Sequence, residues 1–235
     1  TDPWEARDRY IELVLDRTQS RPEWLAQVAS RPLDPSDQER ALGLLEIQRF
    51  CQLMYTSCGW FFADISGIET VQVMKYAGRA LDLMEDLGLV SPREAFLDAL
   101  GEASSNVTEL GTGADIFARS IDPLRTTPSR VAAHLAISGL VDGSDADQTL
   151  AGFHIHTSQT QKQRHGRIMR WTGRIELEEI STSRRHDFAV ASMHLGGVDF
   201  YCALRPYPGN QKFQAATAKF WSNLRTASLP TLLRT

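Results

Sequence analysis

Residues 54–70 read MYTSCGWFFADISGIET and lie between two long stretches of helical periodicity. Three consecutive aromatic residues, Trp60, Phe61 and Phe62, therefore fall at a corner between two predicted helices. Aromatic side chains at such a corner belong either to the core or to a surface that receives a flat ligand such as a sugar ring. Gly59 permits a sharp turn before them. Trp60 is the best suited of the three to contact a ligand, because its indole combines an apolar body with an N–H donor.

Helical patterns extend on both sides of this corner, up to about residue 140. Apolar residues recur at helical spacing, and prolines or capping residues precede each recurrence. We expect Asp64 or Ser66 to cap the helix that runs from Ile68 to Gly88. Five other helices are expected to begin at or near Pro3, Pro22, Pro35, Ala114 and Pro128, with a loop over 106–113. A further helix is expected to begin at a capping box over 91–94, with proline in the first helical position.

The period changes from 3.6 to 2 after residues 142–145, which read DGSD. Strands are expected over 153–158, 171–178, 188–195 and 198–204, with Gly196 and Gly197 as a two-residue hairpin turn. A last helix over 211–226 places Phe213, Phe220 and Leu224 on one face, which suits it to lie on the sheet. The predicted fold is α+β, with an N-terminal helical bundle over 1–142 followed by a small antiparallel sheet and a C-terminal helix over 147–235. We expect the two parts to pack as one unit.

Composition excludes several classes of partner. The chain has 235 residues and a net charge of −4, which gives no electrostatic basis for binding nucleic acid or an anionic membrane. Three cysteines, Cys51, Cys58 and Cys202, are too few for a disulfide framework and are typical of a reducing cytoplasm. No apolar run approaches the roughly 20 residues of a membrane helix. Because Thr1 is not a start methionine and residues 229–235 resemble the start of a helix, we expect a piece of a longer cytoplasmic protein.

Two histidines on one strand face, His154 and His156, could begin a zinc site, with His194 on a neighbouring strand. No Cys, Asp or Glu at matching spacing completes such a site. A solvated polar face is the favoured interpretation, and no metal or cofactor is predicted.

A basic run lies between two predicted strands, beside Trp171. Basic residues interleaved with aromatic ones can bind nucleic acid. One short run in an acidic protein falls short of a basic face, so a solvated hairpin is the favoured interpretation. The run consists of Lys162, Arg164, His165, Arg167 and Arg170.

No catalytic constellation is recognisable. Glycoside hydrolysis needs two carboxylates about 5–10 Å apart, and nothing in the sequence pairs any two. Asp64 and Glu69 are of interest because they flank the aromatic corner, although capping is an equally good role for Asp64. Ser57 and Cys58 lack a nearby histidine and a nucleophile-elbow pattern.

The segment over 54–62, with its continuation over 64–72, resembles an uncharacterised domain family that follows the catalytic barrel in a bacterial branch of glycoside hydrolase family 57. Residues 130–134, 136–138, 188–190, 193–196 and 205–206 also resemble that family. In family 57 enzymes the barrel carries the catalytic Glu and Asp, and a helical region contributes a Ser-x-Asp-Trp-like segment near the cleft. Ser57 and Trp60 match that segment, while Gly59 stands where Asp is usual.

The resemblance implies a non-catalytic region of a glycoside hydrolase or glucanotransferase that acts on α-glucans. The chain would pack on the barrel of the same polypeptide, and Trp60 and Tyr55 would stack on sugar rings. Ser57, Asp64 and Glu69 would be the other substrate-binding residues. The alternative is a stand-alone structural or carbohydrate-binding module without enzymatic activity. An independent hydrolase that uses Asp64 and Glu69 is a weaker third hypothesis.

Overall fold

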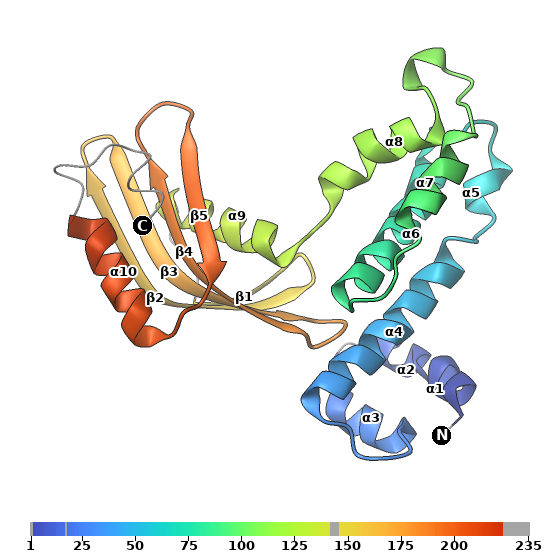
Figure 1. Cartoon of the computed structure of the whole chain (residues 1–235), viewed down its shortest axis with the longest axis horizontal. Coiled ribbons are helices and arrows are strands. Elements are labelled where there is room, and N and C mark those ends of the chain that lie inside the picture. The colour runs from blue at the N-terminus through green and yellow to red at the C-terminus, as the bar shows by residue number, and fades with distance from the viewer. Residues whose placement is uncertain (1, 17, 142–145, 223–235) are drawn as a thin grey trace. The chain divides into compact units, whose positions relative to one another are not determined.

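The computed structural model describes residues 2–16, 18–141 and 146–222, and confirms the α+β class (Figure 1). The chain divides into two compact units. The first holds residues up to Arg125 together with Ser181–Ser183, and the second holds the rest. The division expected at residue 142 therefore differs from the one observed, and residues 142–145 lie outside the described residues. That the two parts pack as one unit remains a prediction.

The first unit is helical. Its longest helices, α4 and α6, pack against each other. One core cluster gathers around Trp24 and Leu42, and another gathers around Met74 and Phe117. The elements are α1 (Pro3–Arg9), α2 (Ile11–Leu15), α3 (Arg21–Val28), α4 (Pro35–Leu53), α5 (Cys58–Phe61), α6 (Ile68–Asp86), α7 (Arg93–Gly101), η1 (Thr108–Leu110), α8 (Gly113–Ser120) and η2 (Asp122–Leu124).

Two predicted helix caps are wrong. The N-cap of α6 is Gly67, without a side-chain bond, and Asp64 instead binds a neighbouring loop. The N-cap of α7 is Pro92 itself, so Ser91 lies one residue too early to form the expected capping box. A capping box does form at α8, where the side chains and backbone of Thr112 and Asp115 bond reciprocally.

The second unit is built on an antiparallel five-stranded sheet in the order β1-β2-β3-β4-β5. The strands are β1 (Asp147–Leu150), β2 (Phe153–His165), β3 (Ile168–Glu179), β4 (Arg185–His194) and β5 (Phe200–Pro206). Strand β1 is an addition to the four predicted strands. Gly196 and Gly197 both have positive φ, as expected for a turn. The loop, however, spans residues 195–199, so the predicted two-residue hairpin is wrong.

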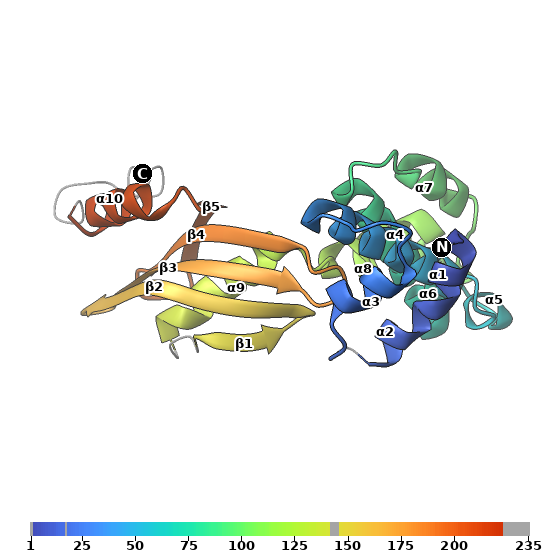
Figure 2. The same ribbon diagram turned by 90° about the horizontal axis from the view of Figure 1, so that it is seen from below.

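A helix lies on each face of this sheet (Figures 1 and 2). Helix α9 (Pro128–Val141) covers the face with Trp171, Ile175 and Val190, and together they form the largest core cluster among the described residues. Helix α10 (Asn210–Ser222) lies on the opposite face, where Phe213 and Phe220 are buried. The predicted last helix is thus confirmed, although Leu224 and the residues after it lie outside the described residues. Because α9 packs on the sheet, it belongs to the second unit.

Candidate functional site

The aromatic corner is built on α5, a single helical turn between α4 and α6. Glycine at position 59 allows α5 to approach α6 closely, since a Cβ there would lie 2.5 Å from Cγ2 of Val73. The hydroxyl of Thr70 donates to the carbonyl of Gly59 at 3.0 Å and fixes the turn on α6. The φ angle of Gly59 is not positive, so its backbone conformation does not require glycine. The close approach of α5 to α6 does require it.

The aromatic side chains of the corner are on the surface. Tyr55 is 76% exposed and Trp60 is 73% exposed, and Phe61, Phe62 and Ile68 are also exposed. Phe61 and Phe62 contact each other edge to face, with ring centroids 5.5 Å apart. These five residues, here called the aromatic corner, therefore expose five large apolar side chains to solvent between Tyr55 and Ile68. The interpretation of the corner as core is therefore wrong.

Asp64 holds the loop next to the corner. Its Oδ1 accepts hydrogen bonds from the backbone N–H of Ser66 at 2.8 Å and from the hydroxyl of Ser105 at 3.0 Å, and its Oδ2 accepts from the N–H of Asn106 at 2.5 Å. The bonds from Ser66, followed by that from Asn106, lower the pKa of Asp64 to about 2. No hydrogen bond or ion pair among the described residues joins Asp64 to Glu69. Asp64 therefore acts as a structural acceptor that ties two loops together.

This role predicts an acid-sensitive loop. The folded-state pKa of Asp64 lies below the ordinary value, so its stabilising contribution is present above about pH 4 and is lost as the pH falls towards 2. The melting temperature of the wild type should therefore fall more steeply between pH 4 and pH 2 than that of Asp64→Asn. Asp98→Asn, a change at an exposed carboxylate on α7, is the matched control. Equal slopes for wild type and Asp64→Asn would contradict this role.

The remaining residues of the predicted site make few contacts. Ser57 is the N-cap of α5 without a side-chain bond, and its carbonyl accepts from the N–H groups of Trp60 and Phe61. Glu69 lies in the first turn of α6. The structure thus brings Ser57 and Trp60 together with Asp64 and Glu69 on one short segment, without a hydrogen-bonded catalytic pair among them.

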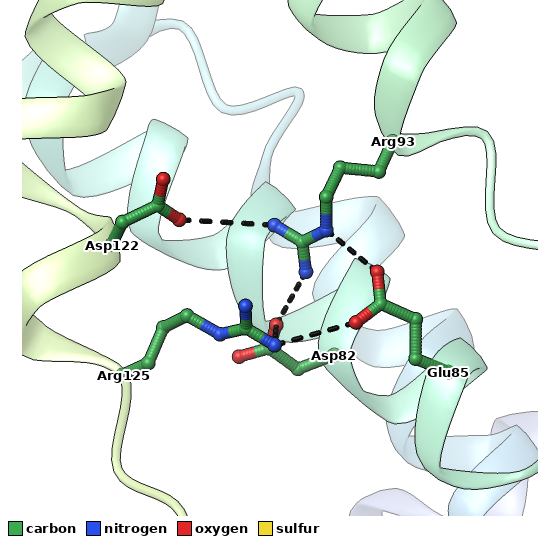
Figure 3. A network of polar contacts seen from close by, with 5 residues as sticks. All are labelled: Asp82, Glu85, Arg93, Asp122 and Arg125. Atoms are coloured by element: carbon green, nitrogen blue, oxygen red, sulfur yellow. Dashed lines mark hydrogen bonds and ion pairs between the residues drawn. The ribbon is translucent and has the colours of Figure 1, made fainter.

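Two carboxylates that do lie together, Asp82 and Glu85 on α6, are paired with arginines (Figure 3). Arg93 of α7 contacts Asp82 at 2.5 Å and Glu85 at 2.6 Å, and Arg125 contacts the same two carboxylates at 2.7 and 3.3 Å. Asp122 of η2 lies 3.9 Å from Arg93. The hydrogen bond from Arg93 lowers the pKa of Glu85. Both carboxylates therefore serve a salt-bridge network that joins α6, α7 and η2.

In the described part of the chain, two concavities lie away from the aromatic corner, each within one unit, and no residue of the corner lines either. One, of about 310 Å³, is lined by α1, α2 and α4. The other, of about 690 Å³, lies on the sheet and is lined by polar side chains that include His154, His156, Glu176 and Glu178. In it, His156 pairs with Asp147 at 2.7 Å and His154 with Thr149 at 3.2 Å. Within the described ranges, no group of three His, Cys, Asp or Glu residues could hold a metal ion.

Comparison with known proteins gives one positive result. A family model described as Domain of unknown function (DUF3536) matches residues 1–235. The search of curated proteins and the search of solved structures give no match. Over the described part of the chain, no helix has the length and apolar character that crossing a membrane requires.

Proposed function

We propose that this chain, which belongs to the DUF3536 family of domains of unknown function, is a non-catalytic region of a cytoplasmic family 57-type glycoside hydrolase that acts on α-glucans. In this proposal the chain packs on the catalytic barrel of the same polypeptide and helps to line the sugar site. The barrel carries the reacting carboxylates, and the chain supplies aromatic contacts.

The observation that carries the proposal is the exposure of the aromatic corner. The segment that resembles the cleft segment of family 57 enzymes is also the segment in which Tyr55, Trp60 and Phe61 project into solvent. Trp60 and Tyr55 suit sugar, because each offers an apolar face for the C–H groups of a ring and a polar atom for its hydroxyls. Phe61, Phe62 and Ile68 have no polar atoms and suit a dry contact with the barrel.

Contacts with α6 and with a neighbouring loop hold the backbone of the aromatic corner in place. The contact of Gly59 with Val73 and the bond from Thr70 hold α5 on α6. The bonds of Asp64 hold the loop that follows. Aromatic groups on a fixed backbone lose little conformational entropy when they bind, which favours a positioned contact surface.

The absence of catalysis by the chain itself is also part of the proposal. A general acid must be protonated at the working pH, and the pKa of Asp64 is lowered to about 2 by its hydrogen bonds. Asp64 is therefore poorly suited to protonate a glycosidic oxygen near neutral pH. This argues against the hypothesis of an independent hydrolase that uses Asp64 and Glu69.

The test is Trp60→Ala in the full-length polypeptide that contains this chain, assayed with maltooligosaccharides. We expect kcat/KM to fall by about 5- to 100-fold, which corresponds to about 1–3 kcal/mol for one aromatic contact. The free energy of unfolding should change by less than about 1 kcal/mol, because the indole is largely exposed.

Trp4→Ala is the matched control. Trp4 is 64% exposed on α1, outside the aromatic corner, and its removal should leave kcat/KM unchanged. If Trp60→Ala and Trp4→Ala have the same activity, the sugar-binding role of the corner is wrong. If the gene encodes no barrel and the chain alone binds maltoheptaose, the stand-alone carbohydrate-binding module is the better account.

A further inference from the structure

One arginine of the basic run, Arg170, is buried and not solvated as the hairpin interpretation expects. Lys162, Arg164 and Arg167 are exposed, as that interpretation expects. Arg170, on β3, is only 7% exposed. The strand alternation places its side chain on the face of the sheet that α10 covers, and its guanidinium carbon lies 4.7 Å from the ring centroid of Trp221 on α10. The solvated interpretation is therefore wrong for Arg170.

The buried guanidinium has no anionic partner within the described residues. Its Nη2 donates to Oε1 of Gln163 at 2.8 Å, while its Nη1 is buried and has no acceptor in the described part of the chain. Burial lowers the pKa of Arg170. A charge out of water is unfavourable unless it is paired and fully hydrogen-bonded. The contact with the indole compensates for this only in part.

Arg174 shows what is missing at Arg170. It lies four residues along the same strand, on the same face, and its guanidinium likewise lies under an aromatic ring, that of Tyr207 at 4.3 Å. Arg174 is also paired with two carboxylates, Asp187 at 2.8 Å and Glu176 at 2.9 Å. The hydrogen bond to Asp187 raises the pKa of Arg174. The two arginines therefore share their aromatic cover and differ in their counter-ions.

The register of the sheet explains the difference. Glu176 of β3 is paired with Asp187 of β4, and the corresponding residues beside Arg170 are Thr172 and Ala191. Both are short and uncharged. The hydroxyl of Thr172 and the Nε1 of Trp221 are buried and, among the described residues, have no hydrogen-bond partner. Three donors on this side of the sheet, from Arg170, Thr172 and Trp221, thus lack acceptors among residues 2–16, 18–141 and 146–222. At the equivalent place beside Arg174, two carboxylates supply them.

We infer that Arg170, Thr172 and Trp221 form a binding site for the carboxylate of a small molecule. Arg170 gives the site one positive charge that no described carboxylate neutralises, and this matches the single charge of a carboxylate ligand. A phosphate ester, with a charge of about −1.5 to −2 at pH 7, would need a further cation. Lys162 and Arg164 point to the other face of β2 and do not supply one. Because Arg170 is only 7% exposed and Thr172 is buried, a small molecule suits the site better than a flat protein surface.

The first experiment follows the indole N–H resonance of Trp221 in the whole chain, assigned by its loss in Trp221→Phe. Acetate is titrated against chloride at constant ionic strength and pH 7. We expect a saturable shift with a dissociation constant on the order of 1–10 mM. Arg170→Gln should weaken binding by about tenfold or more, because it removes a charge-assisted hydrogen bond. Arg164→Gln, the same change at an exposed arginine on the other face, should leave the titration unchanged.

A stability measurement separates ligand binding from a structural role. Arg170→Met removes the buried charge and its unpaired donor, so without acetate its melting temperature should be no lower than that of the wild type. Acetate should raise the melting temperature of the wild type and leave that of Arg170→Met unchanged. The inference is overturned if acetate gives no saturable shift, if Arg170→Gln titrates like Arg164→Gln, or if inorganic phosphate binds more tightly than acetate.

Discussion

Replacing Trp171 with alanine is expected to lower the free energy of unfolding of the sheet unit by about 3–5 kcal/mol. The indole is 2% exposed and lies in the core between the sheet and α9. Two glycines make room for it. A Cβ at Gly173 would lie 2.5 Å from its Cη2, and a Cβ at Gly139 of α9 would lie 3.0 Å from its Nε1. Because the backbone at both glycines packs directly against this ring, the neighbouring residues can fill only part of the cavity that alanine leaves.

Native-state hydrogen exchange of the β3 and β4 amides measures this loss within the unit concerned. Trp4→Ala, the same substitution at an exposed indole, should change the free energy of opening measured at these amides by less than about 0.5 kcal/mol. Gly173→Ala should also destabilise the unit, by about 1–3 kcal/mol, because it forces the indole out of its place. A loss below about 1 kcal/mol for Trp171→Ala would contradict the packing described for this core.

The same residue shows what the sequence makes predictable. Trp171, Ile175 and Leu177 recur with period 2, and all three are buried on one face of β3. Periodicity reports which face of a strand or helix is apolar, and it therefore predicted the α+β class and most element positions. The partner of an apolar face is not encoded by periodicity. For that reason α9 was expected in the helical bundle, although it covers the sheet.

The position of the aromatic corner between two long helices was predictable from the sequence, and its environment only partly. Three adjacent aromatic residues after a glycine marked the corner, but both a core and a surface location satisfied the pattern. Exposure depends on what packs against α5, and only the structure shows that Val73 and Thr70 meet Gly59 while Trp60 remains in solvent. The burial of Arg170 was missed for a similar reason, because its cover comes from Trp221, 51 positions away in the chain.

Breaking the salt-bridge network of Figure 3 is expected to give the second large loss of folding stability. Arg93 is 19% exposed and joins α7 to Asp82 and Glu85 of α6. Burial of the Arg93 guanidinium opposes its charge, but the hydrogen bonds to Glu85 and Asp82 together outweigh it and raise the pKa of Arg93. Removal of one partner from a largely buried ion pair leaves a charge that is poorly compensated, which costs more than the pair itself contributes.

Arg93→Met is therefore expected to lower the free energy of unfolding by about 2–3 kcal/mol at pH 7, somewhat less than for a fully buried pair because Arg125 still contacts both carboxylates. The control is Arg31→Met, which breaks an equally short ion pair with Asp37 at 2.6 Å. Because Arg31 is 67% exposed, this substitution should cost less than about 1 kcal/mol.

The destabilisation by Arg93→Met should also depend on pH. Because the folded-state pKa of Glu85 is lowered, the stabilisation is present above the ordinary glutamate value of about 4.3 and is lost below it. Urea unfolding should thus show a smaller difference between Arg93→Met and wild type at pH 3 than at pH 7, and a pH-independent difference would mean that the side chain acts through packing alone.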